Sequence, residues 1–241
     1  MTTPVNTWLV VNHGERESIE FFEVLPARDS PPVLQWRGCV ETPSKAMFND
    51  VVALPDGGYL ATDPSGGRWV RTRTLLGKLG LKVGRVYRWR PGSGHEPVPN
   101  TAMRDPNGIA RDPSGDAFYV NEYLADEVRK QDLVTGELLA RVEVRQPDNS
   151  NWSADGSLWV ASHDASLLTL AQALGDAPAT RNRIPFAILG VDPDTMQAVE
   201  LFADDGTALG GGTAAVEVGD AMYIGAFRGD RLLRVELSDA P

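Results

Sequence analysis

Hydrophobic positions along the chain fall into many short runs, apolar or alternating with polar residues, and not into long amphipathic stretches. Gly, Pro, Asp and Asn separate these runs, a pattern typical of β-strands joined by tight turns. We therefore expect an all-β chain, with its first strand buried and ending in polar residues. Strands are predicted at residues 7–13, 18–24, 33–40, 84–90, 127–132, 138–144, 198–203 and 231–237.

One longer pattern recurs: an amide or acidic residue, a short apolar run, a turn, and a strand rich in aromatic residues. Copies begin at Asn49, Asn107 and Asn149, and a looser copy begins at Gly211. The starts lie about 40 to 65 residues apart, which is typical of propeller blades built from four-stranded sheets. The predicted fold is an all-β propeller with four-stranded blades, and residues 1–241 are expected to form a single domain.

Two segments interrupt the strand pattern. Residues 68–82 are locally basic and carry leucines at helical spacing, which indicates either an inserted short helix or lid, or a solvated connection. Residues 165–175 form the best helix candidate, with Gly175 as its end. We expect both to be short helical insertions in the propeller.

The composition of the chain argues against several classes of function. The chain has 241 residues, 42% of them hydrophobic, which suffices for a sizeable core. A net charge of −10 argues against nucleic acid, since phosphate binding needs a basic face. Its one cysteine, Cys39, excludes an intramolecular disulfide and disfavours a thiolate metal site. The N-terminus resembles neither a signal peptide nor a membrane span, so a cytoplasmic location is expected.

The starts of the repeats carry the candidate chemistry. The inner strands of a propeller begin around a central channel, so residues at equivalent repeat positions converge there. The residues concerned offer only amide and carboxylate oxygens, the ligands that Ca²⁺ prefers. For any one pair, an ordinary turn that bonds to nearby backbone is the alternative. The candidate metal ligands are Asn49, Asp50, Asn107, Asp148 and Asn149.

Two of the three histidines are candidate proton acceptors. His13 and His163 each follow a strand of the inner type, where a histidine near a metal-bound carbonyl can act as general base toward water. The alternative for each is a hydrogen-bonded core or rim residue. His95 lies in a Pro/Gly-rich loop and is expected to be inert.

Taken in order, these motifs resemble the paraoxonase/arylesterase group of calcium-dependent six-bladed propellers, a superfamily that also includes gluconolactonases and strictosidine-synthase-like proteins. The resemblance runs through nearly all of the chain. It is carried by Leu9–His13, Asn49–Ala53, Asn107–Ile109, Asp148–Asn149, Leu158–Val160 with His163, and residues 205–225.

The resemblance implies a hydrolase of lactones or aryl esters in which Ca²⁺ polarises the carbonyl for attack by water. Asn49, Asn107, Asp148 and Asn149 look like ligands of the catalytic calcium, and Asp50 like a ligand of a second, structural calcium. His13 looks like a member of the family's histidine pair, and His163 like the histidine that lines its pocket.

The front of the chain departs from the family. The family's first blade, with a Glu-Asp pair and the leading histidine, has no counterpart here, so we expect about four to five blades. Open sheet edges would then favour homo-oligomers. The alternatives are a propeller scaffold without turnover, a gluconolactonase-like hydrolase of sugar lactones, and a metal-free strictosidine-synthase-like protein, against which the oxygen-ligand set counts.

Overall fold

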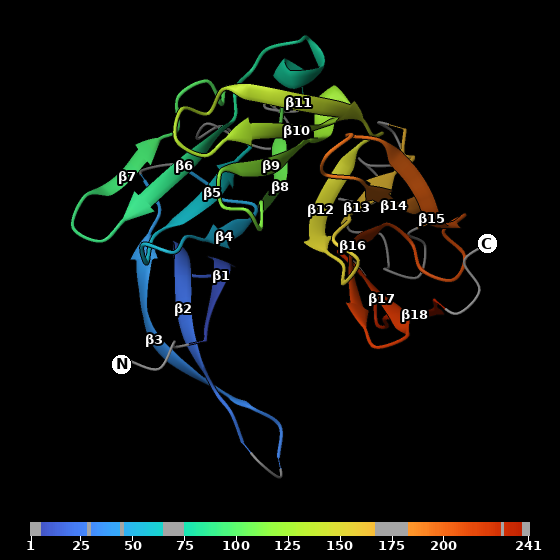
Figure 1. Cartoon of the computed structure of the whole chain (residues 1–241), viewed down its shortest axis with the longest axis horizontal. Helices are drawn as coiled ribbons and strands as arrows, with labels where there is room; N and C mark the ends of the chain where they lie inside the picture. The colour runs from blue at the N-terminus through green and yellow to red at the C-terminus, as the bar shows by residue number, and fades with distance from the viewer. Residues whose placement is uncertain are drawn as a thin grey trace. The chain divides into compact units, whose positions relative to one another are not determined.

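The computed structural model describes residues 6–27, 30–43, 46–64, 75–166, 183–227 and 229–237 (Figure 1). Within these residues nearly all secondary structure is strand, in five antiparallel sheets whose strands follow chain order. Each sheet is a blade, which confirms the predicted all-β propeller of four-stranded blades, with five blades in the described part. Contacts divide the chain into two compact units, residues 1–105 and 106–241. The single domain over residues 1–241 stays a prediction.

The first unit contains two blades. The first blade has the order β1-β2-β3 and the second the order β4-β5-β6-β7. The strands are β1 (Thr7–His13), β2 (Glu17–Leu25), β3 (Val33–Glu41), β4 (Val51–Ala53), β5 (Tyr59–Asp63), β6 (Arg85–Arg90) and β7 (Gly94–Pro97). Ile19, Phe48 and Tyr59 are fully buried in the core between these sheets.

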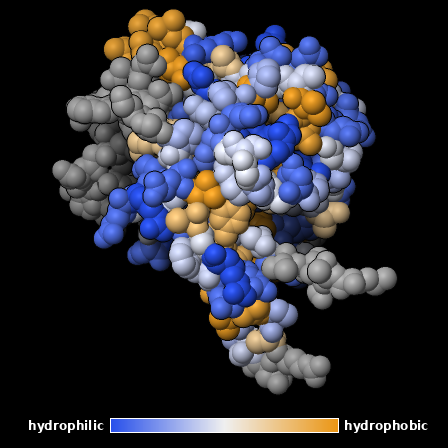
Figure 2. Space-filling view, turned by 90° about the vertical axis from the view of Figure 1, so that its left-hand side faces the viewer, coloured by the Kyte–Doolittle hydropathy of each residue, from blue (hydrophilic) through white to orange (hydrophobic). Residues whose placement is uncertain are grey.

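The first strand has the predicted bounds, but the expectation that it is buried is wrong. Leu9 and Val11 pack against the core of the first unit. Trp8 and Val10, on the opposite face, are 58% and 42% exposed. On that face Ser18 and Glu20 of β2 are nevertheless buried, so only the β1 part of it is largely exposed. Figure 2 shows hydrophobic residues at the surface of the β2–β3 hairpin, the segment that projects downward.

The second unit contains three blades, two with four strands and one with three. A 3-10 turn, η1 (Tyr123–Ala125), follows β9. The strands are β8 (Pro106–Arg111), β9 (Ala117–Glu122), β10 (Glu127–Asp132), β11 (Leu138–Glu143), β12 (Pro147–Trp152), β13 (Leu158–His163), β14 (Phe186–Val191), β15 (Ala198–Asp204), β16 (Gly212–Val218), β17 (Ala221–Ala226) and β18 (Leu233–Glu236).

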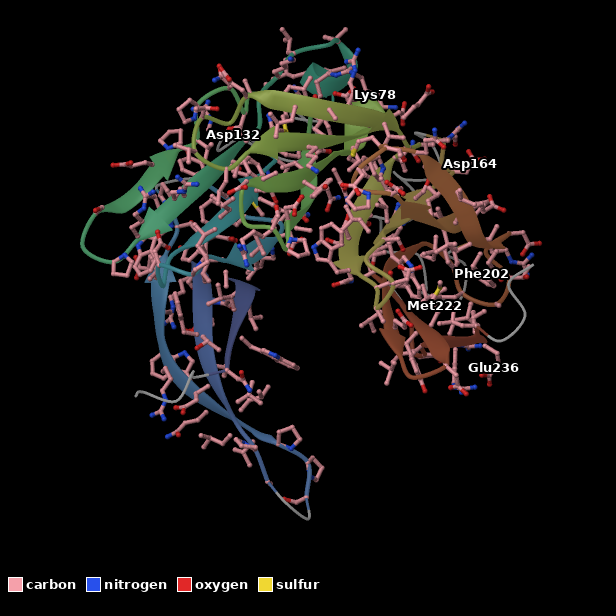
Figure 3. The ribbon with its side chains drawn as sticks, in the orientation of Figure 1. Lys78, Asp132, Asp164, Phe202, Met222 and Glu236 are labelled. Carbon is pink, nitrogen blue, oxygen red and sulfur yellow. The ribbon has the colours of Figure 1, made fainter. Side chains whose placement is uncertain are left out.

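The core of the second unit lies between its blades. Strand β13 is buried along its whole length because both of its faces are covered. Leu158 and Val160 pack toward β8–β11, and Trp159 and Ala161 pack toward β16–β18. Figure 3 labels Met222, a buried residue of this second cluster that packs among side chains of the neighbouring blade. A strand covered on both faces needs a continuous apolar run, as the sequence here has.

Both predicted helical insertions fall partly outside the described residues. Residues 65–74 and 167–182 lie outside the described residues, so nearly half of the first segment and most of the second do too. Residues 75–78 form one helical turn, closed by the bond from the Leu79 N–H to the Leu75 carbonyl at 3.1 Å. In the described part of the chain, no helix has the length and apolar character needed to cross a membrane.

Candidate functional site

Each inner strand of the second unit begins with an irregularity in its pairing. The register shifts between Pro106 and Ile109 in β8, between Pro147 and Ser150 in β12, and between Gly212 and Ala214 in β16. Such bulges turn side chains away from the regular alternation and are frequent beside active sites. Candidate ligands Asn107, Asp148 and Asn149 lie inside the first two irregularities.

Gly108 lets the starts of β8 and β12 approach each other. A Cβ atom at Gly108 would lie 2.4 Å from the Asp148 carbonyl oxygen and 2.7 Å from the Asn149 Cα. No side chain fits such a gap, so glycine is required here for its size. The close approach brings Asn107, the preceding residue, beside the Asp148–Asn149 pair.

A buried amide holds this arrangement in place. Asn121, at the end of β9, is fully buried. Its Nδ2 donates to the Asp148 carbonyl at 2.5 Å and to the Ser150 Oγ at 2.8 Å. The Ser150 hydroxyl lies 3.1 Å from the Asn121 Oδ1. The Asn121 side chain, which belongs to the blade of β8–β11, thereby fixes the backbone of the next blade at Asp148.

The Asp148–Asn149 pair presents oxygen atoms from the start of β12. The Asn149 Nδ2 donates to the Asp148 Oδ1 and to the Thr213 carbonyl, both at 3.0 Å. Because both bonds use the nitrogen, the amide oxygen of Asn149 faces away from them. Asp148 is buried, and its Oδ2 lies 3.7 Å from the His163 Nε2. The Asp148 carboxylate and the Asn149 side chain are thus held next to each other, with the nitrogen of Asn149 on the side of the carboxylate.

His163 is fixed on both ring nitrogens. Its Nε2 donates to the Gly212 carbonyl at 3.0 Å, and its Nδ1 accepts from the Tyr123 hydroxyl at 3.2 Å. Burial lowers its pKa from 6.5 to about 4, although the Gly212 carbonyl acts in the opposite direction. The ring is therefore neutral at pH 7, and its lone pair is already in use.

The last residue of β9 carries a charged group that the sequence argument did not single out. Glu122 is buried, and its Oε2 accepts from the Arg129 Nη1 at 2.9 Å. Arg129 is also buried and lies 3.7 Å from a Glu127 oxygen. Glu122 ends β9 as His163 ends β13 and Asp63 ends β5. The second strand of each of these blades thus ends in a polar or charged residue. This recurrence could have identified Glu122, and its neighbour Asn121, from the sequence.

Asn49 and Asp50 lie in the first unit, directly before β4. The Asn49 N–H donates to the Thr62 carbonyl at 2.9 Å, and the Asp50 N–H donates to the Thr62 Oγ1 at 3.1 Å. The Asp50 Oδ1 accepts from the Val51 N–H at 2.8 Å. These bonds fix the backbone at the repeat start, while the Asn49 side chain is exposed.

His13 ends β1 and has an acidic partner. Its Nδ1 lies 2.7 Å from the Glu17 Oε2, directly across the β1–β2 pair. Half of the His13 side chain is exposed. With the Nδ1 proton donated to Glu17, the Nε2 carries the lone pair and is accessible. A carboxylate that orients a histidine in this way is the usual arrangement of a general base.

The second unit brings Asn107, Asp148, Asn149 and His163 together, and the first unit contains Asn49, Asp50 and His13. Within the described residues no group of three His, Cys, Asp or Glu side chains stands in metal-binding geometry. Three of the five candidate ligands are asparagines. A group defined by His, Cys, Asp and Glu does not count their amide oxygens. The assignment of these seven residues to a site therefore stays a prediction.

The chain matches the family model described as the SMP-30/Gluconolactonase/LRE-like region over residues 25–179. This match covers more than half of the chain, so the protein belongs to that family of β-propellers. No curated protein matches the chain.

Solved structures resemble it at low sequence identity. A gluconolactonase from Xanthomonas campestris is 18% identical, with 91% of this chain and 69% of that one covered at a TM-score of 0.51. Virginiamycin B lyase from Staphylococcus aureus is 14% identical, with 99% and 69% covered and a TM-score of 0.53. A chain of a nidogen/laminin complex is 12% identical, with 96% and 89% covered and a TM-score of 0.56. At these identities the likeness establishes the fold alone.

Proposed function

We propose that this protein hydrolyses lactones with the aid of a bound calcium ion. The observation that carries the proposal is the group of oxygen-bearing side chains at the starts of β8 and β12. Membership in a family whose description includes gluconolactonase supports the choice of a cyclic ester. Aryl esters, the substrates implied by the paraoxonase-like motifs, are the second class of substrate that we expect to be hydrolysed.

The residues of the second unit fit a calcium ion by the chemistry of their donors. Asp148 supplies a buried carboxylate, bonded to the amide of Asn149 and facing a neutral imidazole. Asn149 and Asn107 supply neutral amide oxygens, and calcium accepts about six to eight oxygens in loose geometry. Asn49 and Asp50 are the further ligands that the sequence resemblance implies. When bound, calcium polarises the carbonyl of an ester and stabilises the oxyanion.

The sequence resemblance implies His13 as the general base, and we assign a positioning role to His163. His13 is accessible, and Glu17 holds its Nδ1 so that the Nε2 can take a proton from water. In His163 the lone pair lies on Nδ1 and already accepts a hydrogen bond from the Tyr123 hydroxyl. Its contribution is to fix the Gly212 carbonyl beside Asp148.

A binding protein without turnover is the second candidate. The locked ring of His163 and the Glu122–Arg129 pair favour it, because both stabilise the unit without offering a group to a substrate. A metal-free strictosidine-synthase-like activity is less well supported, since it leaves the oxygen set at β8 and β12 without a role.

The test is hydrolysis of a δ-lactone and of phenyl acetate by the full chain, with calcium and then with a chelator. We expect lactone hydrolysis that the chelator abolishes and that His13→Gln lowers by about a hundredfold or more, the lower end of the range for general-base catalysis. The variant should keep its calcium-dependent thermal stabilisation. Stabilisation by calcium without hydrolysis would instead select the binding protein, and hydrolysis that resists the chelator would refute the metal-assisted proposal.

A further inference from the structure

The residue before β12 has a backbone conformation that is unusual for its type. Gln146 has a φ of 39°, in the left-handed region that residues other than glycine, asparagine and aspartate seldom adopt. Such conformations persist only where the surrounding structure determines them, and they cluster at functional sites. Gln146 stands two residues before the candidate ligand Asp148, so the contacts that hold Gln146 also bear on the candidate site.

Main-chain hydrogen bonds hold Gln146 from two sides. Its N–H donates to the Asp126 Oδ1 at 2.9 Å, which ties it to the turn between β9 and β10. Its carbonyl accepts from the His163 N–H at 3.2 Å, which ties it to the end of β13. Asp126 is itself in the left-handed region, with a φ of 58°, and its carbonyl accepts from the Val144 N–H at 3.0 Å. Both main-chain polar groups of Gln146 thus have partners outside β12.

The side chain of Gln146 makes a second pair of hydrogen bonds. Its Nε2 donates to the Ala165 carbonyl at 2.9 Å, and its Oε1 accepts from the Ala165 N–H at 3.0 Å. The amide therefore pairs with the Ala165 main chain as a peptide group of a neighbouring strand would. Gln146 and Ala165 are both buried, and Ala165 packs on the fully buried Ile184. A glycine would adopt the same φ without strain but would lack this amide.

These bonds join two residues of the candidate site. Gln146 is separated from Asp148 only by Pro147, whose ring fixes its own φ. On the other side, Gln146 bonds to the main chain of His163 and of Ala165. The Asp148 Oδ2 lies 3.7 Å from the His163 Nε2, so the separation of these side chains depends on how β12 begins relative to the end of β13. Gln146 is covalently joined to the first of these strand ends and hydrogen-bonded to the second.

We propose that Gln146 is a positioning residue of the candidate site, which sets the separation between the Asp148 carboxylate and the His163 imidazole. It acts through these two residues, because Ala165 engages both ends of its amide. Its effect on calcium rests on the function proposed above, whereas its effect on His163 does not. Replacing a residue that orients metal ligands typically changes metal affinity by about 10- to 100-fold.

The first test is nuclear magnetic resonance of the histidine rings in the full chain without calcium. The chain has three histidines, and His163→Gln assigns the ring signals of His163 by their loss. The Nε2 proton of His163 is bonded to the Gly212 carbonyl in a buried position and should exchange slowly with water. Gln146→Gly removes the amide, and Gln146→Glu replaces its donor by an oxygen that faces the Ala165 carbonyl. Each variant should shift this signal and raise its exchange rate by on the order of tenfold or more.

Met196→Gly is the matched control. Met196 is also buried in the second unit and has a φ of 53°, but it lies between β14 and β15, at the end of the blade opposite to His163. Its replacement should lower the Tm and leave the His163 signal unchanged. Circular dichroism verifies folding, and Gln146→Glu keeps the length of the side chain in case the glycine variant does not fold. Loss of folding in both variants would overturn the positioning role, because Gln146 would then hold the whole unit.

The second test is calorimetric titration of the folded chains with calcium. In a wild-type chain that binds calcium, both Gln146 variants should raise the Kd by on the order of tenfold or more, and Met196→Gly should leave it unchanged. An unchanged His163 signal in the folded Gln146 variants, or an unchanged Kd, would overturn the proposal. A changed signal in a chain that does not bind calcium would support the positioning role and refute the calcium site, so the two proposals can fail separately.

Discussion

Truncation of Asn121 is expected to destabilise the second unit more than its small size suggests. The side chain is fully buried and bonds to the Asp148 carbonyl and to the Ser150 hydroxyl, at 2.5 and 2.8 Å. Each hydrogen bond contributes about 1 kcal/mol, and a buried acceptor that loses its donor costs about 1–3 kcal/mol. We therefore expect Asn121→Ala to lower the free energy of unfolding by about 3 kcal/mol.

Calorimetry is the appropriate assay, because a chain with two compact units need not unfold in one step. For a protein of this size, 1 kcal/mol corresponds to about 2–4 °C in Tm, so Asn121→Ala should lower the Tm of the second unit by about 6–12 °C. The matched variant Ser150→Ala keeps the bond to the Asp148 carbonyl and should cost only about 1 kcal/mol. Equal effects of the two variants would refute the claim that Asn121 holds Asp148 in place.

Two further predictions concern the same region. Gly108→Ala should cost about 1–3 kcal/mol in the free energy of unfolding, measured by chemical denaturation, because its Cβ would lie 2.4 Å from the Asp148 carbonyl; wild-type stability would contradict the close approach. The pKa of His163 is lowered to about 4, so below about pH 6.5 the unfolded chain binds the extra proton and stability falls as pH falls, by up to about 3 kcal/mol. His163→Gln should lose this contribution and His13→Gln should keep it; an unchanged pH dependence in His163→Gln would show that His163 is not its source.

The strands were predictable where the pattern of the sequence matched the local environment. The hairpin of β10 and β11 was predicted almost to the residue, since its turn and its alternating strands are local features. Strand β14 was missed although Phe186–Val191 is a continuous apolar run that ends at the turn beginning with Asp192. His95 was expected in a loop but lies on β7, where its Nε2 meets the Tyr59 hydroxyl at 2.7 Å. That contact joins residues far apart in the sequence, so local composition could not reveal it.

The candidate site, too, was only partly predictable from the sequence. The repeat identified Asn107, Asp148 and Asn149, because a recurring polar residue before an apolar run is visible without a structure. The partners that position them come from other strands: Asn121 from β9 and the Thr213 carbonyl from β16. The exposure of Trp8 was also hidden, since an apolar run predicts a strand but does not say whether both of its faces are covered.

The most direct test of the account is the calcium dependence of thermal stability in the wild-type chain and in Asp148→Asn. A ligand that binds only the folded state at about 100 times its Kd adds about 2.7 kcal/mol, which corresponds to about 5–11 °C in Tm. We expect this increase in the wild-type chain and in the control Asp192→Asn, a change at an exposed turn whose carboxylate caps its own backbone. Asp148→Asn should lose it. An equal response to calcium in Asp148→Asn, or no response in the wild-type chain, would contradict a calcium site at the starts of β8 and β12.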